Sequence, residues 1–194
     1  MNSIYLLRHC AYSNPLNILP GRLPVELSQE GKENALRLKE YFADKNIKQI
    51  YASAVLRCKQ TAEIIADHAI PLTFDQRLLE TFSAYQGYWE GNVNDAWDHF
   101  FGHRNELGGE SFIDIKERMA SFWDEITADL HDNIIICSHG DQLQILFSYI
   151  HGQPLVTEDE SEENIPGWIN KGEFIEIIWD EGKVLETRKK GKTL

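Results

Sequence analysis

The chain has 194 residues and a formal net charge of -12, with 42% hydrophobic and 26% charged residues. This composition is typical of a globular protein and excludes a disordered or fibrous chain, and the length predicts a single domain covering residues 1–194. The acidic balance argues against nucleic acid as the main partner, because nucleic-acid binding depends on basic surface. An anionic ligand would therefore need a local cationic pocket.

The first half of the chain predicts a strand–helix–strand unit. Residues 3–7 are a short apolar run, typical of a buried strand, and a polar loop that contains proline follows them. A helical apolar stripe then lies between residues 35 and 42, after a start near Ser28, and a second strand is expected at residues 49–52. The next helix begins close to Arg57.

The second half continues the alternation of helices and strands. The expected elements are an amphipathic helix at 112–130, a buried strand at 133–137, an apolar helix from about Gln142, and strands at 173–179 and 183–187. Together they predict an α/β fold, a three-layer α/β/α sandwich with a largely parallel central sheet and room for an antiparallel edge.

Four side chains suited to binding an anion follow strands of this predicted sheet. They are Arg8, His9, Arg57 and His139. Ligands on such sheets bind beyond the carboxyl ends of the strands, so these side chains should meet. A phosphoryl group in transfer is stabilised by fixed positive charge and hydrogen-bond donors, and a neutral imidazole can attack phosphorus to form a covalent phosphoenzyme. The pattern predicts His9 as a nucleophile.

Five short segments occur in an order that resembles the histidine phosphatase superfamily, also called the phosphoglycerate mutase-like family. The segments are Leu7-Arg8-His9-Cys10, residues 53–62, Gly87-Tyr88-Trp89-Glu90-Gly91, Gly108-Gly109-Glu110-Ser111 and Cys137-Ser138-His139-Gly140. The resemblance implies a phosphohistidine intermediate and no metal or other cofactor. The catalytic residues it implies are His9, Glu80 and His139, and the substrate-binding residues are Arg8, Arg57, Asn14 and Gly140.

The proton donor has two candidates. Family members usually use a glutamate after a leucine-rich stretch, and Leu78-Leu79-Glu80 resembles that stretch. The interval from Glu80 to the Gly87 segment is longer than usual in the family, which leaves Glu90 as a competitor.

The loop after His9 departs from the family pattern at Cys10, Ala11 and Tyr12. These departures bear on the substrate more than on catalysis. Cys10 beside a cationic pocket would be either a packing residue or an oxidation-sensitive thiol.

The expected activity is hydrolysis of a small metabolite phosphate such as α-ribazole phosphate or a sugar phosphate. The stretch from Asn92 to Gly109 is short for a mutase of this family, which favours a phosphatase. Phosphoglycerate mutase-type transfer, a protein phosphohistidine phosphatase and a phosphate-binding pseudoenzyme are the alternatives.

The cellular setting follows from what the chain lacks. No apolar run reaches the roughly 20 residues that cross a bilayer, and the N-terminus lacks the order of a signal peptide. Three widely spaced cysteines fit reduced thiols. We expect a cytoplasmic protein that binds a small phosphate ester, has no nucleic-acid or membrane partner, and is compatible with a homodimer.

Overall fold

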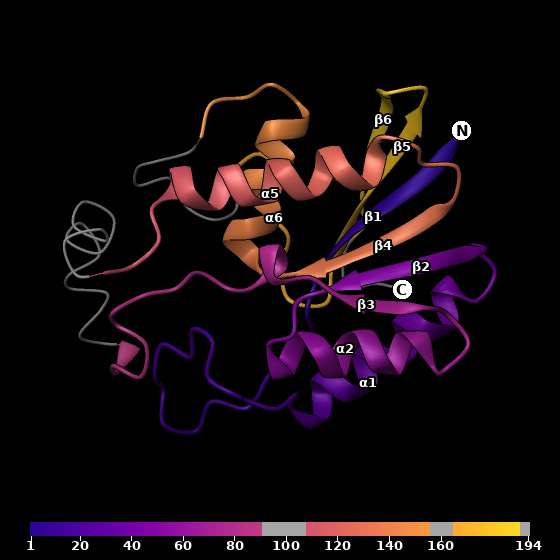
Figure 1. Ribbon diagram of the computed structural model, residues 1–194. Helices are drawn as coiled ribbons and strands as arrows, with labels where there is room; N and C mark the ends of the chain where they lie inside the picture. The colour runs from indigo at the N-terminus through magenta and orange to yellow at the C-terminus, as the bar shows by residue number, and fades with distance from the viewer. Residues whose placement is uncertain (91–107, 156–164, 191–194) are drawn as a thin grey trace.

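The computed structural model describes residues 1–90, 108–155 and 165–190, and these build one six-stranded mixed sheet in the order β3-β2-β4-β1-β5-β6 (Figure 1). The strands are β1 Asn2–Arg8, β2 Ile47–Ala52, β3 Leu72–Phe74, β4 Asn133–Ser138, β5 Phe174–Asp180 and β6 Lys183–Lys190. The pairs β3–β2, β2–β4 and β4–β1 are parallel, whereas β5 and β6 add antiparallel strands beside β1.

Helices cover both faces of the sheet, which confirms the predicted three-layer α/β fold (Figure 1). One face carries α1 Gln29–Phe42 and α2 Leu56–Ala66, and the other carries α5 Phe112–Thr127 and α6 Gly140–Ile150. A short 3-10 helix, η1 Gln76–Leu78, follows β3. Within the described ranges, no helix is long and apolar enough to cross a membrane.

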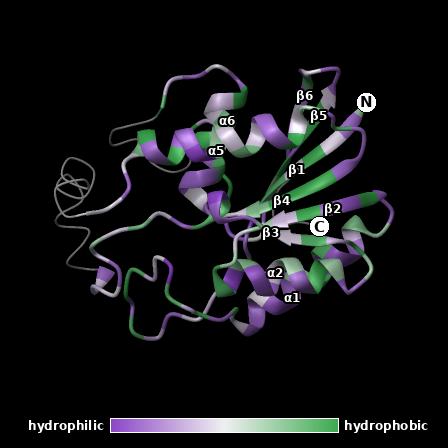
Figure 2. Cartoon of the chain, in the orientation of Figure 1, coloured by the Kyte–Doolittle hydropathy of each residue, from purple (hydrophilic) through white to green (hydrophobic). Residues whose placement is uncertain are grey.

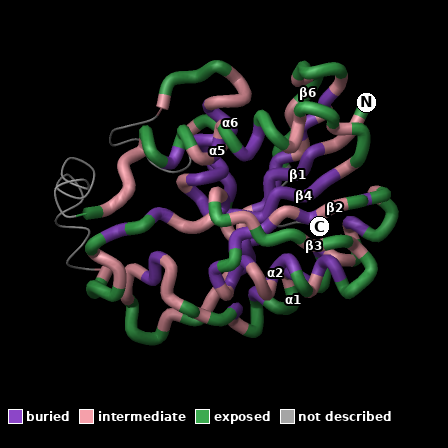
Figure 3. Tube along the Cα trace, viewed as in Figure 1, coloured by how far each residue is buried: buried purple, intermediate pink, exposed green. Residues whose placement is uncertain are grey.

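The central strands are apolar on both sides because each of their faces packs against helices (Figure 2). In β1, Ile4 and Leu6 join the core under α5 and α6, while Tyr5 and Leu7 join the core over α1 and α2. Strand β4 contributes to both cores in the same alternating way. Figure 3 shows this buried centre, with the exposed chain confined to the periphery.

Side-chain caps fix where two of the helices begin. The hydroxyl of Ser28 accepts a hydrogen bond from the amide of Gly31 at the start of α1. Ser111 and Asp114 form a reciprocal capping box at the start of α5. His139 precedes α6 without such a cap, so its imidazole is available for other contacts.

Strand register brings the two histidines together. Arg8 of β1 pairs with Ser138 of β4, so His9 and His139 leave the sheet side by side. Ala52 of β2 pairs with Cys137, which puts Ser53 at the same edge. Parallel pairing therefore gathers three strand ends into one place, as expected for a ligand site in an α/β sheet.

Candidate active site

His9 has one ring nitrogen committed to the backbone. Its Nδ1 lies 2.9 Å from the carbonyl oxygen of Cys10, which can only accept, so Nδ1 carries the hydrogen. Nε2 of the neutral ring then has a lone pair, which faces Nε of Arg57 at 3.1 Å. Burial lowers the pKa of His9 well below its usual value, and the charges of Arg57, His139 and Arg8 lower it further. The ring is therefore neutral and held in the tautomer that a nucleophile requires.

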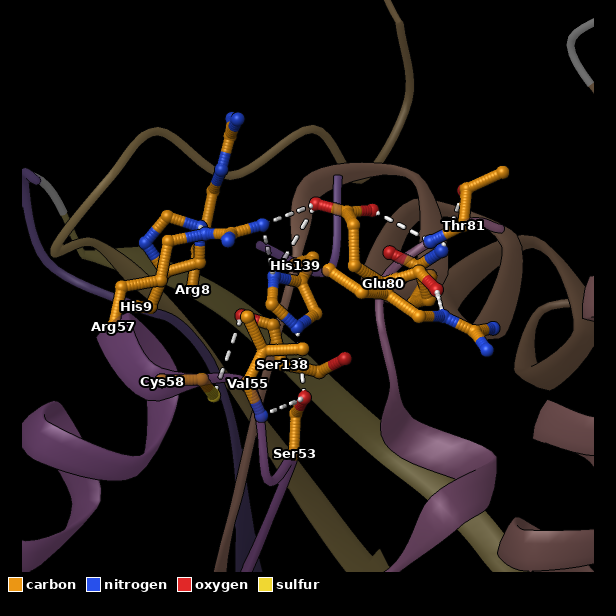
Figure 4. A network of polar contacts seen from close by, with 12 residues as sticks. Arg8, His9, Ser53, Val55, Arg57, Cys58, Glu80, Thr81, Ser138 and His139 are labelled. Carbon is orange, nitrogen blue, oxygen red and sulfur yellow. Dashed lines mark hydrogen bonds and ion pairs between the residues drawn. The ribbon is translucent and has the colours of Figure 1, made fainter. Parts of the chain in front are cut away.

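Arg57, in the first turn of α2, contacts His9, His139 and Glu80. Its side chain is 1% exposed. Besides contacting His9, its Nη2 donates to Glu80 Oε2 at 2.9 Å and lies 3.2 Å from His139 Nδ1 (Figure 4). Within the described part of the chain, Nη1 of Arg57 is buried without a hydrogen-bond partner. A buried unsatisfied donor is costly, and this one is suited to an oxyanion.

His139 closes the opposite side of the site. Its Nε2 lies 2.9 Å from the Ser53 hydroxyl, and its ring centroid is 5.1 Å from that of His9. Glu80 Oε2 is 3.3 Å from Nδ1, a contact that would favour the imidazolium. Burial and the neighbouring arginines, Arg57 first, outweigh that contact and lower the pKa of His139 well below its usual value.

Arg8 supplies a second orphaned donor. Its Nη1 donates to the carbonyl of Ile169 at 3.0 Å, and its guanidinium lies 4.9 Å from the ring centre of Trp168. Its Nε, among the described residues, is buried and has no hydrogen-bond partner. Gly140 lets these groups approach the start of α6, because a Cβ at this position would lie 3.0 Å from both Arg8 Cζ and the Trp168 ring. A helix N-terminus adds favourable potential for an anion.

The Glu80 carboxylate lies between Arg57 and Thr81 (Figure 4). Oε2 accepts from Arg57, while Oε1 accepts from the backbone amide of Thr81 at 2.9 Å. The main chain is also fixed, since Arg22 Nε donates to the Glu80 carbonyl at 2.7 Å and Ser138 Oγ donates to the Leu78 carbonyl at 2.8 Å. One carboxylate is thus held against Arg57 and His139.

A family model described as "Histidine phosphatase superfamily (branch 1)" matches residues 4–162 of this sequence. The chain belongs to this superfamily. The resemblance seen in the sequence is thereby confirmed, and so is the prediction that the protein is a phosphatase enzyme.

Known proteins agree with this assignment. The chain is 30% identical over 161 residues to Rv0525 of Mycobacterium tuberculosis, covering 78% of this chain and 80% of that protein. It is 25% identical over 169 residues to phosphoserine phosphatase 1 of Hydrogenobacter thermophilus, covering 80% and 79%. The α-ribazole phosphatase structure from Shigella flexneri superposes with a TM-score of 0.77 at 21% identity, covering 94% of this chain and 93% of that one, which shows a shared fold.

In this histidine phosphatase, the side chain of Asn14 is hydrogen-bonded within the loop that follows His9. Its amide donates to the carbonyl of Ile18 at 2.9 Å, and its oxygen accepts from the Ile18 amide at 3.2 Å. Glu90 Oε1 lies 3.5 Å from the same side-chain nitrogen. Asn14 and Glu90 therefore meet at the loop that contains Ile18. Glu80, in contrast, contacts Arg57 and His139. Gly91 and the short stretch up to residue 107 lie outside the described residues.

The loop after His9 places an aromatic ring over the site. The Tyr12 ring centre lies 5.6 Å from that of His9, 5.3 Å from Arg57 Cζ and 4.4 Å from Lys171 Nζ. Cys10 is fully buried, and burial raises the pKa of its thiol to about 12. This environment favours a packing role for Cys10.

Three contacting residues were not assigned roles from the sequence. Ser53 belongs to a segment that resembles the family, which was the available signal. Arg22 and Gln142 gave no local signal, since their contacts with the Glu80 segment depend on tertiary structure.

Proposed function

We propose that the protein hydrolyses small phosphate monoesters in two steps through a phosphohistidine at His9. The observation that carries the proposal is the fixed tautomer of His9, with Nδ1 bound to a carbonyl and the lone pair of Nε2 directed to Arg57. A neutral imidazole whose Nε2 lone pair can exchange the Arg57 hydrogen bond for a phosphorus atom is a competent nucleophile.

The phosphoryl oxygens would bind the donors that the protein leaves unsatisfied. Arg8 Nε and Arg57 Nη1 are buried and without partners in the described ranges. His139 lies at the same edge beside Arg57 and Glu80, and the start of α6 at Gly140 adds backbone dipoles there. These groups would stabilise the charge that spreads over the equatorial oxygens during transfer.

Glu80 would move the protons. In the first step the His9 Nε2–phosphorus bond forms, the ester bond breaks, and the Glu80 proton passes to the leaving oxygen. In the second step water attacks phosphorus, the nitrogen–phosphorus bond breaks, and the water proton returns to Glu80. Support comes from the position of Oε2, which is 2.9 Å from Arg57 and 3.3 Å from His139. Glu90 is supported less well, because its observed partner is Asn14.

The proposed substrate is a small metabolite ester, such as α-ribazole phosphate, a sugar phosphate or phosphoserine. The names of an α-ribazole phosphatase and a phosphoserine phosphatase among the similar proteins support this class. We include Asn14 and Gly140 as substrate contacts in the proposal, and no metal is required by the chemistry described.

The test is phosphate release from an aryl phosphate in the presence of a chelator, comparing the native protein with His9→Ala and His131→Ala. His131 is a surface histidine paired with Asp129, so it provides a matched control. The proposal predicts turnover that only His9→Ala abolishes. Native-like turnover in His9→Ala, or activity that requires a metal, would overturn it.

A further inference from the structure

Gln142 is buried next to the carboxylate of Glu80. It is the third residue of α6 and is 0% exposed. Burying an amide is unfavourable unless its polar atoms are paired, so its hydrogen bonds determine which way it is oriented. The amide can be oriented in two ways. In one of them its oxygen would face Oε1 of Glu80, which is unfavourable because both atoms are acceptors.

The orientation that satisfies both ends of the amide connects Glu80 with Thr81. Gln142 nitrogen then donates to Glu80 Oε1 at 3.0 Å. Its oxygen accepts from the Thr81 hydroxyl at 2.8 Å and lies 3.0 Å from the Thr81 amide. Glu80 Oε1 therefore accepts the Gln142 N–H and shares the Thr81 amide hydrogen with the Gln142 oxygen.

We infer that Gln142 is a positioning residue that selects Oε2 of Glu80 as the oxygen that carries the transferred proton. This inference rests on the proposed role of Glu80. A proton on Oε1 would face two N–H donors, which is unfavourable because both would lose their acceptor. Oε2 also accepts a hydrogen bond, from Arg57 Nη2, and lies 3.3 Å from His139 Nδ1, but the Arg57 donor can be redirected to a bound phosphoryl group. When Arg57 turns its donors to the phosphoryl oxygens, Oε2 becomes free for the proton while Gln142 and Thr81 still hold Oε1.

Comparing esters with different leaving groups distinguishes a positioning role of Gln142 from a purely structural role. A nitrophenolate departs with little protonation, whereas an alkoxide needs a proton from a correctly placed acid. Gln142→Leu keeps a similar volume but removes the amide. Because both esters share the second step, the leaving group is compared through kcat/KM, which reports the steps up to the phosphohistidine. We expect kcat/KM for an alkyl phosphate to fall about 10-fold or more, while kcat/KM for p-nitrophenyl phosphate changes less than about 3-fold.

Gln144→Leu is the matched control, because Gln144 lies on the same helix, is also buried, and bonds Ser148. It should leave the ratio of the two kcat/KM values unchanged. Equal losses on both esters in Gln142→Leu, no loss on either, or the same change in Gln144→Leu would overturn the inference.

Gln142→Glu provides a second test that does not depend on the leucine variant folding. A protonated glutamic acid can donate to Glu80 Oε1, whereas a glutamate at this position repels it. Burial and the adjacent Glu80 carboxylate would raise the pKa of an acid at this position. We expect kcat/KM on the alkyl ester to approach the native value at about pH 5 and to fall about 10-fold below it at about pH 8. A kcat/KM relative to native that stays constant with pH would contradict the inference. If His9→Ala retained activity, the proposed function itself would fail, so the two failures are distinguishable.

Discussion

Arg57 directs its Nε hydrogen at Nε2 of His9 from 3.1 Å away. The same guanidinium bonds Glu80 through Nη2 and leaves Nη1 without a partner among the described residues. One side chain therefore contacts the proposed nucleophile and the proposed acid, and it has a donor left for a phosphoryl oxygen. The planar arrangement of five N–H donors makes this possible, and lysine cannot reproduce it.

Arg57→Lys should reduce kcat/KM on an aryl phosphate by about 100-fold or more, the usual effect of losing a transition-state donor. The ammonium keeps the charge but lacks the planar set of donors with which Arg57 serves His9, Glu80 and phosphate. Arg188→Lys is the control, because Arg188 is an exposed residue paired with Glu186. Activity of Arg57→Lys within about threefold of native would contradict this role.

Gly140→Ala should lower activity while leaving the protein folded. The added Cβ would lie 3.0 Å from Arg8 Cζ and from the Trp168 ring, so Arg8 must shift. Small displacements of a positioning group reduce rates strongly, and we expect roughly a 10- to 100-fold loss in kcat/KM. Gly152→Ala adds a methyl group where no atom lies within 4 Å, although φ is +63° there. That control should lower the melting temperature without lowering kcat, and native activity in Gly140→Ala would refute the contact.

The free energy of unfolding should decrease as pH falls below about 6.5, the ordinary pKa of histidine. In the folded state the pKa values of His9 and His139 lie well below that value, so only the unfolded chain gains protons there. The stability that depends on the neutral state of the two rings is fully present above about pH 6.5. It is lost as the pH falls toward the folded-state pKa, at up to about 1.4 kcal/mol per pH unit for each ring.

Denaturant titrations at pH 5 and pH 7 measure this effect. His9→Gln should show a smaller difference between the two pH values than the native protein, because one of the two rings is gone. His131→Gln, which changes an exposed histidine, should match the native difference. An unchanged difference in His9→Gln would show that the His9 ring does not resist protonation.

The cysteine thiols should be unreactive in the folded protein. Cys10, Cys58 and Cys137 are all buried and free, and burial raises the pKa of Cys10 to about 12. A disulfide reagent at pH 8 should react with no cysteine of the native protein and with three cysteines after denaturation. One fast equivalent accompanied by loss of activity would instead support the oxidation-sensitive alternative for Cys10.

Much of the fold was predictable because the central strands carry their signal locally. The apolar run at residues 133–137 and the short run at residues 3–7 became β4 and β1, each within one residue of the predicted bounds. The β3 strand was missed, since Leu72–Phe74 is only three residues long and lies at the sheet edge, without a buried face to impose alternation. The helix expected at 112–130 ends earlier, at Thr127.

The site was predictable where side chains directly follow strands. Strand ends meet at one edge, so Arg8, His9 and His139 could be grouped before any contact was known. Glu80 could be found only by resemblance, because it follows a 3-10 turn and not a strand. Gln142 could not be found, since a glutamine in an apolar helix gives no indication of its partner across the fold. The bonding of Asn14 to Ile18 likewise depends on the shape of the loop.

Rapid quenching of the native protein with a radiolabelled phosphate ester, followed by peptide mapping, tests the phosphohistidine mechanism most directly. The label should be bound to the protein in an acid-labile, alkali-stable form and map to His9. Label on another residue, or turnover with no protein-bound label at any quench time, would contradict the mechanism.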